Sequence, residues 1–444
     1  MMDPRAPELP PGAPRPEVLN LLPYLGKWIL LSCAVAAMAG TASALFLYAL
    51  DWATATREAH RWLLAFLPVA GCCVGWLYLR IGQQVEAGNN LLIDEIHDPK
   101  KIVPLRMAPL VLGATVISHL FGASVGREGT AVQMGGALAD QLTHHLKLSH
   151  EDRRILLMAG ISAGFASVFG TPLAGAVFGL EVLAIGRIRY EALFPCLLAA
   201  MGADQVGLMW GVHHTRYVIS AVPQLSTWNL CAMLLAGIAF GFAGKYFADL
   251  THALGAWFKR TIAYAPLRPL VGGSMLAATA WFLHADRYLG LGIPIIVEAF
   301  AQPLPPYDFA AKLAFTVASL GSGFKGGEVT PLFYIGATLG NALAPLLHMP
   351  VSLLAGMGFV AVFAGAANTP LACTLMAMEL FGAEVGLYAA LACVVSYLCS
   401  GHTGIYSAQR VGHAKHRHAP EGITLSELAA YRKSRSANQE RQEP

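Results

Sequence analysis

The sequence predicts an all-α protein that crosses a membrane many times and is built from two related halves. Of its 444 residues, 55% are hydrophobic and only 13% are charged, and the mean hydropathy is +0.52. A soluble domain carries about 25% charged residues. Several apolar runs reach the length of about 17–25 residues that spans a bilayer. In addition, motifs of the first half recur in the second half at a nearly constant spacing.

The apolar segments fall into two kinds, long runs and shorter interrupted ones. The long runs, which we expect to be simple spans, cover 27–50, 61–80, 102–122, 190–211, 228–252 and 382–400. The shorter stretches at 160–183, 328–347 and 350–381 contain Gly and Pro, and we expect broken or re-entrant helices there. Broken helices are tolerated in a membrane only where they line a cavity or are buried in protein. The functional site is therefore expected in these segments.

The termini and the basic residues predict the orientation. Residues 1–23 are Pro-rich and contain acids but no apolar core, so they form no signal peptide and are expected to be a cytoplasmic N-terminal segment. Basic pairs at 100–101, 153–154 and 259–260 are predicted to be cytoplasmic by the positive-inside rule. We expect a multi-pass inner-membrane protein with both termini in the cytoplasm.

This layout divides the chain into a membrane domain and two terminal segments. The membrane domain is expected over 24–410, as repeats of about 24–212 and 228–410, followed by a cytoplasmic basic tail over 411–444. The tail also holds Glu421, Glu427 and Glu440, which argues against a nucleic-acid partner. The lipid bilayer is the expected partner.

Cysteine and histidine give no sign of a metal or redox centre. The eight cysteines lie in or beside apolar segments and form no C-x-x-C pair. His413, His416 and His418 are close together, but in a basic tail without apparent acidic or cysteine partners. We therefore predict no metal and no cofactor.

The internal repeat is carried by three pairs of segments. G-R-E-G-T at 126–130 matches G-G-E-V-T at 326–330, and T-P-L-A at 171–174 matches the same letters at 369–372, each with a glutamate further on (Glu181 and Glu379). A weaker pair is 88–91 with 290–293. Internal symmetry with interrupted helices at corresponding positions is typical of transporters, whose site lies near the bilayer midplane.

The Gly-rich helix entries also indicate the charge of the substrate. They expose backbone N–H groups at positive helix ends, which suit anions. Asn89 adds amide donors and Tyr406 a hydroxyl donor. No Lys or Arg is needed, because a permanent charge would bind the anion too tightly for release.

These motifs resemble those of the CLC chloride channels and proton-coupled exchangers, over roughly 25–410. Residues 126–130 resemble the family's G-R-E-G-P, whose glutamate is the gate; 326–337 and 160–181 resemble two further motifs, and Tyr406 stands where the family has its anion-binding tyrosine. The resemblance implies inverted repeats and a homodimer with one pathway per subunit. It also implies that Glu128 gates the pathway and couples protons. The anion-binding residues that it implies are Asn89, Gly126, Glu328, Val329, Thr330 and Tyr406.

Departures from the chloride members point to one branch. Asn89 replaces the anion-coordinating serine, Val329 between Glu328 and Thr330 replaces a phenylalanine, and Thr130 replaces the proline after the gate. These changes are similar to the branch that exchanges fluoride for protons. Val182 stands where chloride exchangers carry a second glutamate, so protons need another route, as in that branch.

Each candidate residue also has an ordinary structural interpretation. Glu128 could pair with Arg127, Glu328 could simply face a helix dipole, and Thr330 could be a helix N-cap. Asn89 could cap a helix over 90–98, and Tyr406 could be a core tyrosine. Glu181 and Glu379 are expected to cap or pair structurally.

Three functions remain open at this point. The first is a secondary active transporter that exports fluoride in exchange for protons. The second is a passive chloride or fluoride channel, or a chloride/proton exchanger, with the same fold. The third is a membrane hydrolase that uses Ser124 in G-A-S-V-G, but this motif needs a strand–turn–helix and a histidine base, and the nearest histidine is His119. We do not expect an enzyme.

Overall fold

A computed structural model of the protein describes residues 17–416 and 419–440. Its first helix, α1 (Glu17–Ala59), is much longer than the apolar run at 27–50 and passes through Pro23. The expected N-terminal segment over 1–23 therefore overlaps this helix from residue 17, and its first 16 residues lie outside the described part.

The first half continues with short and long helices that alternate. They are η1 (Arg61–Phe66), α2 (Leu67–Leu77), η2 (Tyr78–Gly82), η3 (Gln83–Val85), α3 (Asn89–His97), α4 (Met107–Leu120), α5 (Glu128–Leu146), α6 (His150–Phe169), α7 (Pro172–Glu181), β1 (Ala184–Ile185), η4 (Tyr190–Ala192) and α8 (Leu193–Met209).

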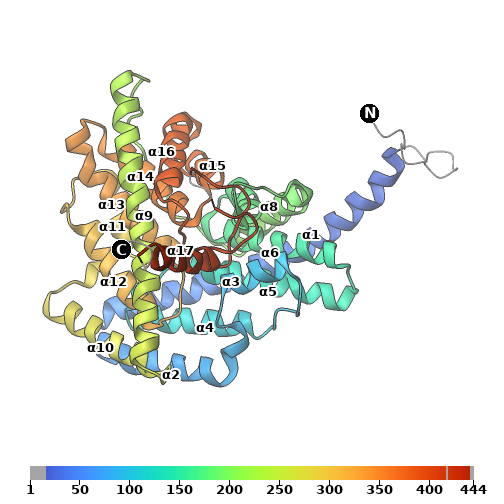
Figure 1. The fold of residues 1–444 in the computed structure, drawn as a ribbon, viewed down its shortest axis with the longest axis horizontal. Helices are drawn as coiled ribbons and strands as arrows, with labels where there is room; N and C mark the ends of the chain where they lie inside the picture. Colours follow the sequence, from blue (N-terminus) through green and yellow to red (C-terminus); the bar gives the residue numbers. More distant parts are fainter. Residues whose placement is uncertain (1–16, 417–418, 441–444) are drawn as a thin grey trace.

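The second half repeats the order of the main helices, with α9 to α16 corresponding to α1 to α8. It comprises α9 (Thr227–Thr261), α10 (Leu267–Phe282), η5 (Asp286–Tyr288), α11 (Ile293–Ala301), α12 (Asp308–Ser322), α13 (Val329–Leu347), α14 (Val351–Ala367), α15 (Pro370–Phe381), η6 (Ala383–Val385), α16 (Gly386–Cys399), β2 (Arg410–Val411) and α17 (Leu425–Glu440). The halves lie side by side, and α9 runs the full height of the view in Figure 1. The architecture is all-α, apart from the short pairing of β1 with β2.

The membrane spans differ in part from those expected. Helices long and apolar enough to cross a membrane cover Leu21–Ala59, Arg61–His97, Tyr190–Met209, Thr227–Thr261 and Val329–Leu347. The expected span at 102–122 contains a helix of only 14 residues, because the chain turns at Gly122 (φ 94°) into the loop before α5. The expected span at 382–400 is also shorter, over Ala383–Cys399.

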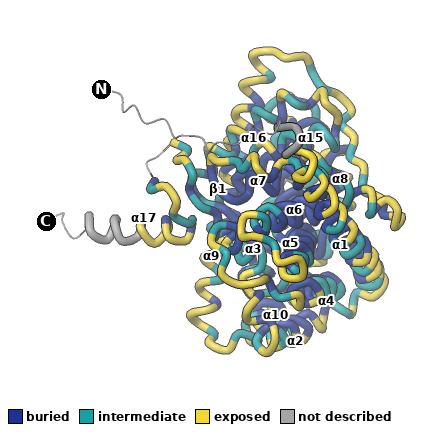
Figure 2. Tube along the Cα trace, turned by 90° about the vertical axis from the view of Figure 1, so that its right-hand side faces the viewer, coloured by how far each residue is buried: buried dark blue, intermediate teal, exposed yellow. Residues whose placement is uncertain are grey.

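By contrast, the stretch at 328–347 was expected to be broken and forms one continuous helix, α13. Its glycines are packing positions and do not interrupt it. A Cβ on Gly336 would lie 2.0 Å from the Gly358 oxygen of α14, and a Cβ on Gly135 would lie 2.2 Å from the Gly160 oxygen of α6. Small residues let membrane helices approach closely. The same kind of contact therefore joins α5 to α6 and α13 to α14. Most residues of these four helices are buried, as Figure 2 shows for α5 and α6.

The two halves meet through backbone groups of the two equivalent glycine motifs. Gly126 N donates to Gly327 O at 2.6 Å, and Gly327 N donates to Gly126 O at 2.8 Å, in an antiparallel bridge. Antiparallel pairing between equivalent segments is what a pseudo-two-fold axis produces. This axis passes between the loops that lead into α5 and α13.

The glutamates Glu181 and Glu379 cap helices across the same axis. Glu379 accepts hydrogen bonds from the first free amides of α7, Leu173 N and Ala174 N, both at 2.8 Å. Glu181 accepts from the first free amides of α15, Leu371 N at 3.1 Å and Ala372 N at 2.8 Å. Carboxylates are stabilising at helix N-termini. The expectation of a structural capping role is confirmed for both residues.

The C-terminal segment packs back onto the helices. Strand β2 pairs in parallel with β1, and Gln409 Nε2 donates to Val182 O at 3.0 Å. Lys415 Nζ donates to Asn368 Oδ1 at 2.6 Å and to Tyr397 O at 2.5 Å. Tyr406 is thus held in a loop that is fixed at both ends. The basic tail, expected from residue 411, begins inside β2.

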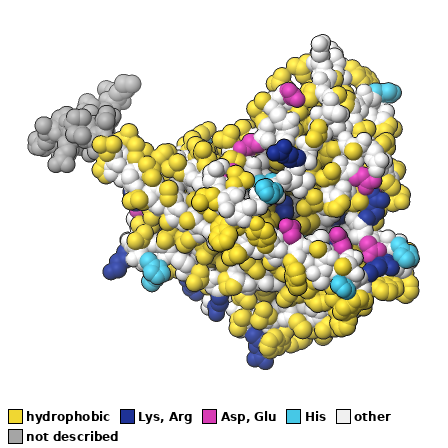
Figure 3. Space-filling model, turned by 180° about the vertical axis from the view of Figure 1, so that it is seen from behind, with side chains coloured by type: hydrophobic (Ala, Val, Ile, Leu, Met, Phe, Trp, Pro, Cys, Tyr) yellow, Lys and Arg dark blue, Asp and Glu magenta, His cyan; other side chains and the backbone are white. Residues whose placement is uncertain are grey.

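The outer surface is largely apolar. Figure 3 shows hydrophobic side chains over most of one face, with few charged groups between them. Large exposed apolar side chains include Leu30, Trp52, Leu234, Phe282 and Leu387. Such a surface is typical of contact with lipid, so the chain is a polytopic membrane protein.

Candidate functional site

The structure brings Asn89, Glu328 and Tyr406 to one cavity of about 220 Å³, although they come from α3, α13 and the C-terminal loop. The entry of α5 lies at the same place. A Cβ on Gly129 would be 3.0 Å from Asn89 Nδ2, 3.2 Å from Gly327 Cα and 3.6 Å from Glu328 Oε2. Glycine at 129 therefore lets three helix entries converge beside the pseudo-two-fold axis.

Glu128, the predicted gate, is fully buried and reaches from the first turn of α5 to the first turn of α13. Its carboxylate accepts hydrogen bonds from Thr330 N at 3.0 Å and from Thr330 Oγ1 at 2.5 Å. It also accepts from Arg127 N at 3.2 Å and Arg127 Nε at 3.4 Å. The pair with Arg127 is thus present, but the shorter bonds go to the other repeat. The carboxylate occupies a helix N-terminus that suits any anion.

Glu328 is placed differently. It is the N-cap residue of α13, but its side chain makes no capping bond, and its buried Oε2 has no hydrogen-bond partner among the described residues. A buried carboxylate oxygen without a partner is costly. A ligand or a proton in this cavity would satisfy it.

Asn89 and Thr330 do not cap their own helices. The N-cap of α3 is Gly88 (φ 59°), Asn89 is the first helical residue, and its Oδ1 is buried without a partner in the described chain. The Thr330 hydroxyl donates to Glu128. The capping interpretation is therefore wrong for both residues, and their polar groups point to the site.

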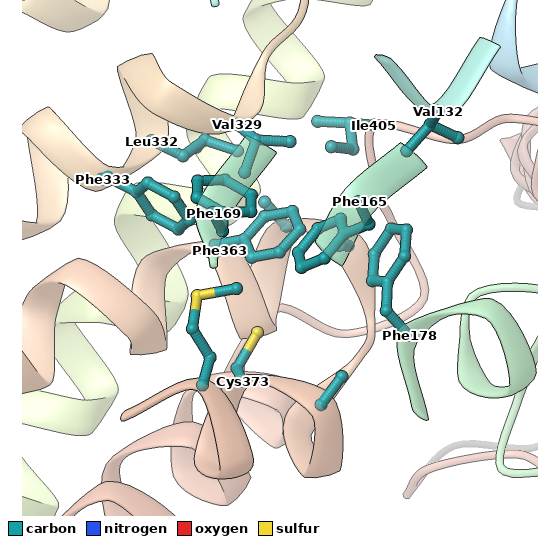
Figure 4. Close-up of a cluster of buried hydrophobic side chains, with 14 of the residues drawn as sticks. Val132, Phe165, Phe169, Phe178, Val329, Leu332, Phe333, Phe363, Cys373 and Ile405 are labelled. Carbon is teal, nitrogen blue, oxygen red and sulfur yellow. The ribbon is translucent and has the colours of Figure 1, made fainter. Parts of the chain in front are cut away.

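Tyr406 and Val329 border a cluster of buried aromatic side chains. Tyr406 is buried, and its ring lies 6.5 Å from that of Phe178 in an edge-on arrangement. Figure 4 shows Val329 beside the cluster formed by Phe165, Phe169, Phe178, Phe333 and Phe363. The rings of Phe165 and Phe178 stack at 4.2 Å. These stacked rings form an apolar wall beside the site.

The two glutamates line different cavities. Glu328 lines the cavity that contains Asn89, whereas Glu128 lines one of about 20 Å³ with Arg127, Thr330 and His214. A cavity of that size holds about one water molecule. Gly126 and Gly327, which lie two residues and one residue before these glutamates, form the bridge described above.

Several polar residues of the cavity were not predicted from the sequence, and Lys325 is the basic one among them. Lys325 lines the cavity with Asn89, Glu328 and Tyr406, although no basic residue was thought necessary there. The available signal was its position directly before the second-half glycine motif.

No metal centre is evident in the part of the chain that the structure describes, where no three His, Cys, Asp or Glu residues group as ligands. His413 does have an acidic neighbour, contrary to expectation, because its Nδ1 lies 3.1 Å from Glu421 Oε1. His418 lies outside the described residues.

Comparisons with known proteins agree with this architecture. Residues 70–401 match the family described as voltage gated chloride channel. The "Chloride/fluoride channel protein" of Pseudomonas syringae pv. tomato is 64% identical over 434 residues, 96% of each chain. The "H(+)/Cl(-) exchange transporter ClcA" of Cronobacter sakazakii is 27% identical over 387 residues, 79% of this chain and 81% of its own.

Solved structures show the same fold. A CLC-type fluoride/proton antiporter is 36% identical, with a TM-score of 0.85, over 87% of this chain and 98% of its own. A slow cyanobacterial Cl-/H+ antiporter is 20% identical, with a TM-score of 0.74, over 84% and 94% of the two chains. The protein therefore belongs to the voltage gated chloride channel family, the CLC family that its motifs resemble.

Proposed function

We propose that the protein is a secondary active transporter that exports fluoride across the inner membrane in exchange for protons. The observation that carries this proposal is the position of Glu128, whose carboxylate occupies the N-terminus of α13 as an anion would. Two names that mention fluoride also support this proposal. One belongs to a relative that is 64% identical and the other to a solved structure that is 36% identical.

The coupling follows from the chemistry of one carboxylate. Ionised Glu128 competes with the anion for Thr330 N and Oγ1. Protonation makes the side chain neutral and removes the charge that those donors stabilise, so that it leaves and the anion enters. An ionisable group inside a membrane is costly unless it has such a function. Anion entry and proton uptake are thereby linked.

We assign the selectivity for fluoride to the hydrogen-bond donors on either side of the backbone bridge between Gly126 and Gly327. Fluoride is small and strongly hydrated, and replacing its water requires several well-placed donors. We assign this role to Asn89 Nδ2, the Tyr406 hydroxyl and Thr330, with Gly126 and Val329 shaping the passage between them. The Tyr406 hydroxyl makes no hydrogen bond within the described chain and is available to an ion.

Glu328 is proposed to accept the proton on the other side of the gate. Val182 provides no acid there, whereas Glu328 lies in the Asn89 cavity with an unpartnered oxygen. The positive-inside rule makes this cavity the cytoplasmic one, because α3 begins at the cavity and runs to the basic pair at 100–101. The same rule supports the cytoplasmic placement of both termini.

We also propose a homodimer, with a complete pathway in each subunit. This arrangement is what the resemblance to the CLC family implies. Size measurement of the purified protein, with the bound detergent subtracted, tests this. A monomer that transports at full rate would contradict it.

Two other functions fit less well. A passive channel needs no carboxylate held in the anion's place. A Ser124 hydrolase lacks a base, because Ser124 Oγ hydrogen-bonds to Thr316 Oγ1 at 2.9 Å and lies in a loop before a helix, not after a strand. We therefore propose that the protein is not an enzyme.

Flux from liposomes tests the proposal. Purified protein is reconstituted with fluoride or chloride inside, and anion efflux and internal pH are recorded together. We expect a fluoride gradient to drive protons inward, with much slower chloride movement. Fluoride efflux without proton movement would make the protein a channel. Chloride efflux as fast as fluoride efflux would remove the selectivity assigned to Asn89.

A further inference from the structure

Lys325 is a charged residue in the cavity that the mechanism above does not use. It lies in the loop between α12 and α13, and the cavity that it lines also contains Asn89, Glu328 and Tyr406. Its side chain is partly buried, and its ammonium lies 4.4 Å above the ring centroid of Tyr78. In the described chain this contact with Tyr78 is the one found for the ammonium, without an ion pair within 4.0 Å or a hydrogen bond.

A partly buried ammonium usually has a carboxylate partner. The other charged lining residues are Glu86, which is exposed, and Glu328, and His252 is the one further titratable side chain besides the tyrosines. Glu86 acts on the Lys325 ammonium electrostatically but forms no contact with it within 4.0 Å. The face of Tyr78 compensates only part of the lost hydration. An anion in the cavity would supply the missing partner.

The position of Lys325 also limits what it does. It makes no hydrogen bond or ion pair with Asn89, Glu328 or Tyr406, so it is not one of the donors that would replace the water around the ion. A charge at the wall of a narrow cavity raises the local concentration of counter-ions and speeds their entry. It does so without the tight contact that prevents release.

We propose that Lys325 recruits the hydrated anion into the cytoplasmic cavity and thereby sets the KM for fluoride on that side, acting as a positioning residue ahead of Asn89 and Tyr406. This inference rests on the proposed transport of fluoride. It assigns to Lys325 an effect on anion capture and none on proton coupling.

The test compares Lys325→Met, Lys325→Arg and the control Lys101→Met, a charge on the same side that is exposed and outside the cavity. Fluoride-driven proton movement is measured in inverted and in right-side-out membrane vesicles. We expect Lys325→Met to raise KM about five- to tenfold on the cytoplasmic face only, with maximal rate and coupling unchanged. Lys325→Arg should restore the wild-type KM, and Lys101→Met should not change it.

A measurement on the unaltered protein covers the case in which Lys325→Met does not fold. Raising ionic strength with potassium gluconate should increase the wild-type KM on the cytoplasmic face and change it little on the other face. An equal salt effect on both faces, or an unchanged KM in Lys325→Met, overturns the inference. Absence of fluoride-driven proton movement in the wild-type protein would instead overturn the proposed function.

Discussion

The two repeats have the same helices but use equivalent residues in opposite ways. Glu128 reaches across the axis and accepts hydrogen bonds from Thr330, whereas Glu328 has an oxygen with no partner in the described chain. Thr130, the equivalent of Thr330, bonds to Thr115 within its own half at 2.7 Å. Helix packing and capping are symmetric, and the hydrogen bonds at the site are not. The symmetric scaffold thus presents two carboxylates to two different cavities.

The largest expected difference between the halves is in proton coupling. Glu128→Gln should lower fluoride-driven proton movement by about 10²-fold, because an amide cannot release and take up the proton. Glu328→Gln should slow proton movement by only about tenfold, since water in its larger cavity can replace it in part. Both are measured as internal pH in fluoride-loaded liposomes. Equal loss in both variants would mean that the carboxylates act as one unit.

Packing should respond equally in the two halves. Gly135→Ala and Gly336→Ala each place a methyl group against a backbone oxygen, at 2.2 and 2.0 Å, and each should destabilise the protein by about 2 kcal/mol. Thermal unfolding in detergent measures this, with Gly26→Ala as a control because no atom lies within 4 Å of its Cβ. If only one of the pair is destabilised, the helix contacts are not equivalent.

Substitutions of the equivalent residues Thr130 and Thr330 should distinguish an effect on fluoride flux from an effect on stability. Thr330→Val removes a donor to a carboxylate and should cost about 1.5 kcal/mol and slow fluoride flux. Thr130→Val breaks only its bond to Thr115, so it should lower stability by about 1 kcal/mol with little change in flux. Paired unfolding and flux measurements decide between these outcomes. A flux defect in Thr130→Val as large as that in Thr330→Val would contradict the assignment.

The smallest expected effects are in the reciprocal caps. Glu181→Gln and Glu379→Gln each leave one acceptor oxygen for two amides and should cost about 1 kcal/mol. The loss should be greater for Glu181, which is buried, than for the half-buried Glu379. Unfolding temperatures of the two variants measure the order. Unchanged temperatures would show that the amides find other partners.

The sequence predicted the repeats, because glycines and glutamates at helix entries have fixed backbone and charge requirements. Through the resemblance to the CLC family, it also led to the prediction that Glu128 gates the pathway. The sequence-based prediction failed where the role of a residue depends on which distant segments pack against it in the folded protein. The glycines of α13 look like helix breakers, yet they are contacts with α14 that the sequence does not specify. Lys325 was missed because its environment is formed by Tyr78 and Asn89, which lie far away in the chain.

The capping of α7 by Glu379 and of α15 by Glu181 has a consequence for biosynthesis. Residue 379 is made about 200 residues after the amides that it caps, so α7 enters the membrane with its first amides unsatisfied. Each half supplies the glutamate that caps a helix of the other half. Neither half can therefore satisfy the first amides of its own re-entrant helix alone. The amides of α7 therefore gain their carboxylate partner only after the second half has been synthesised.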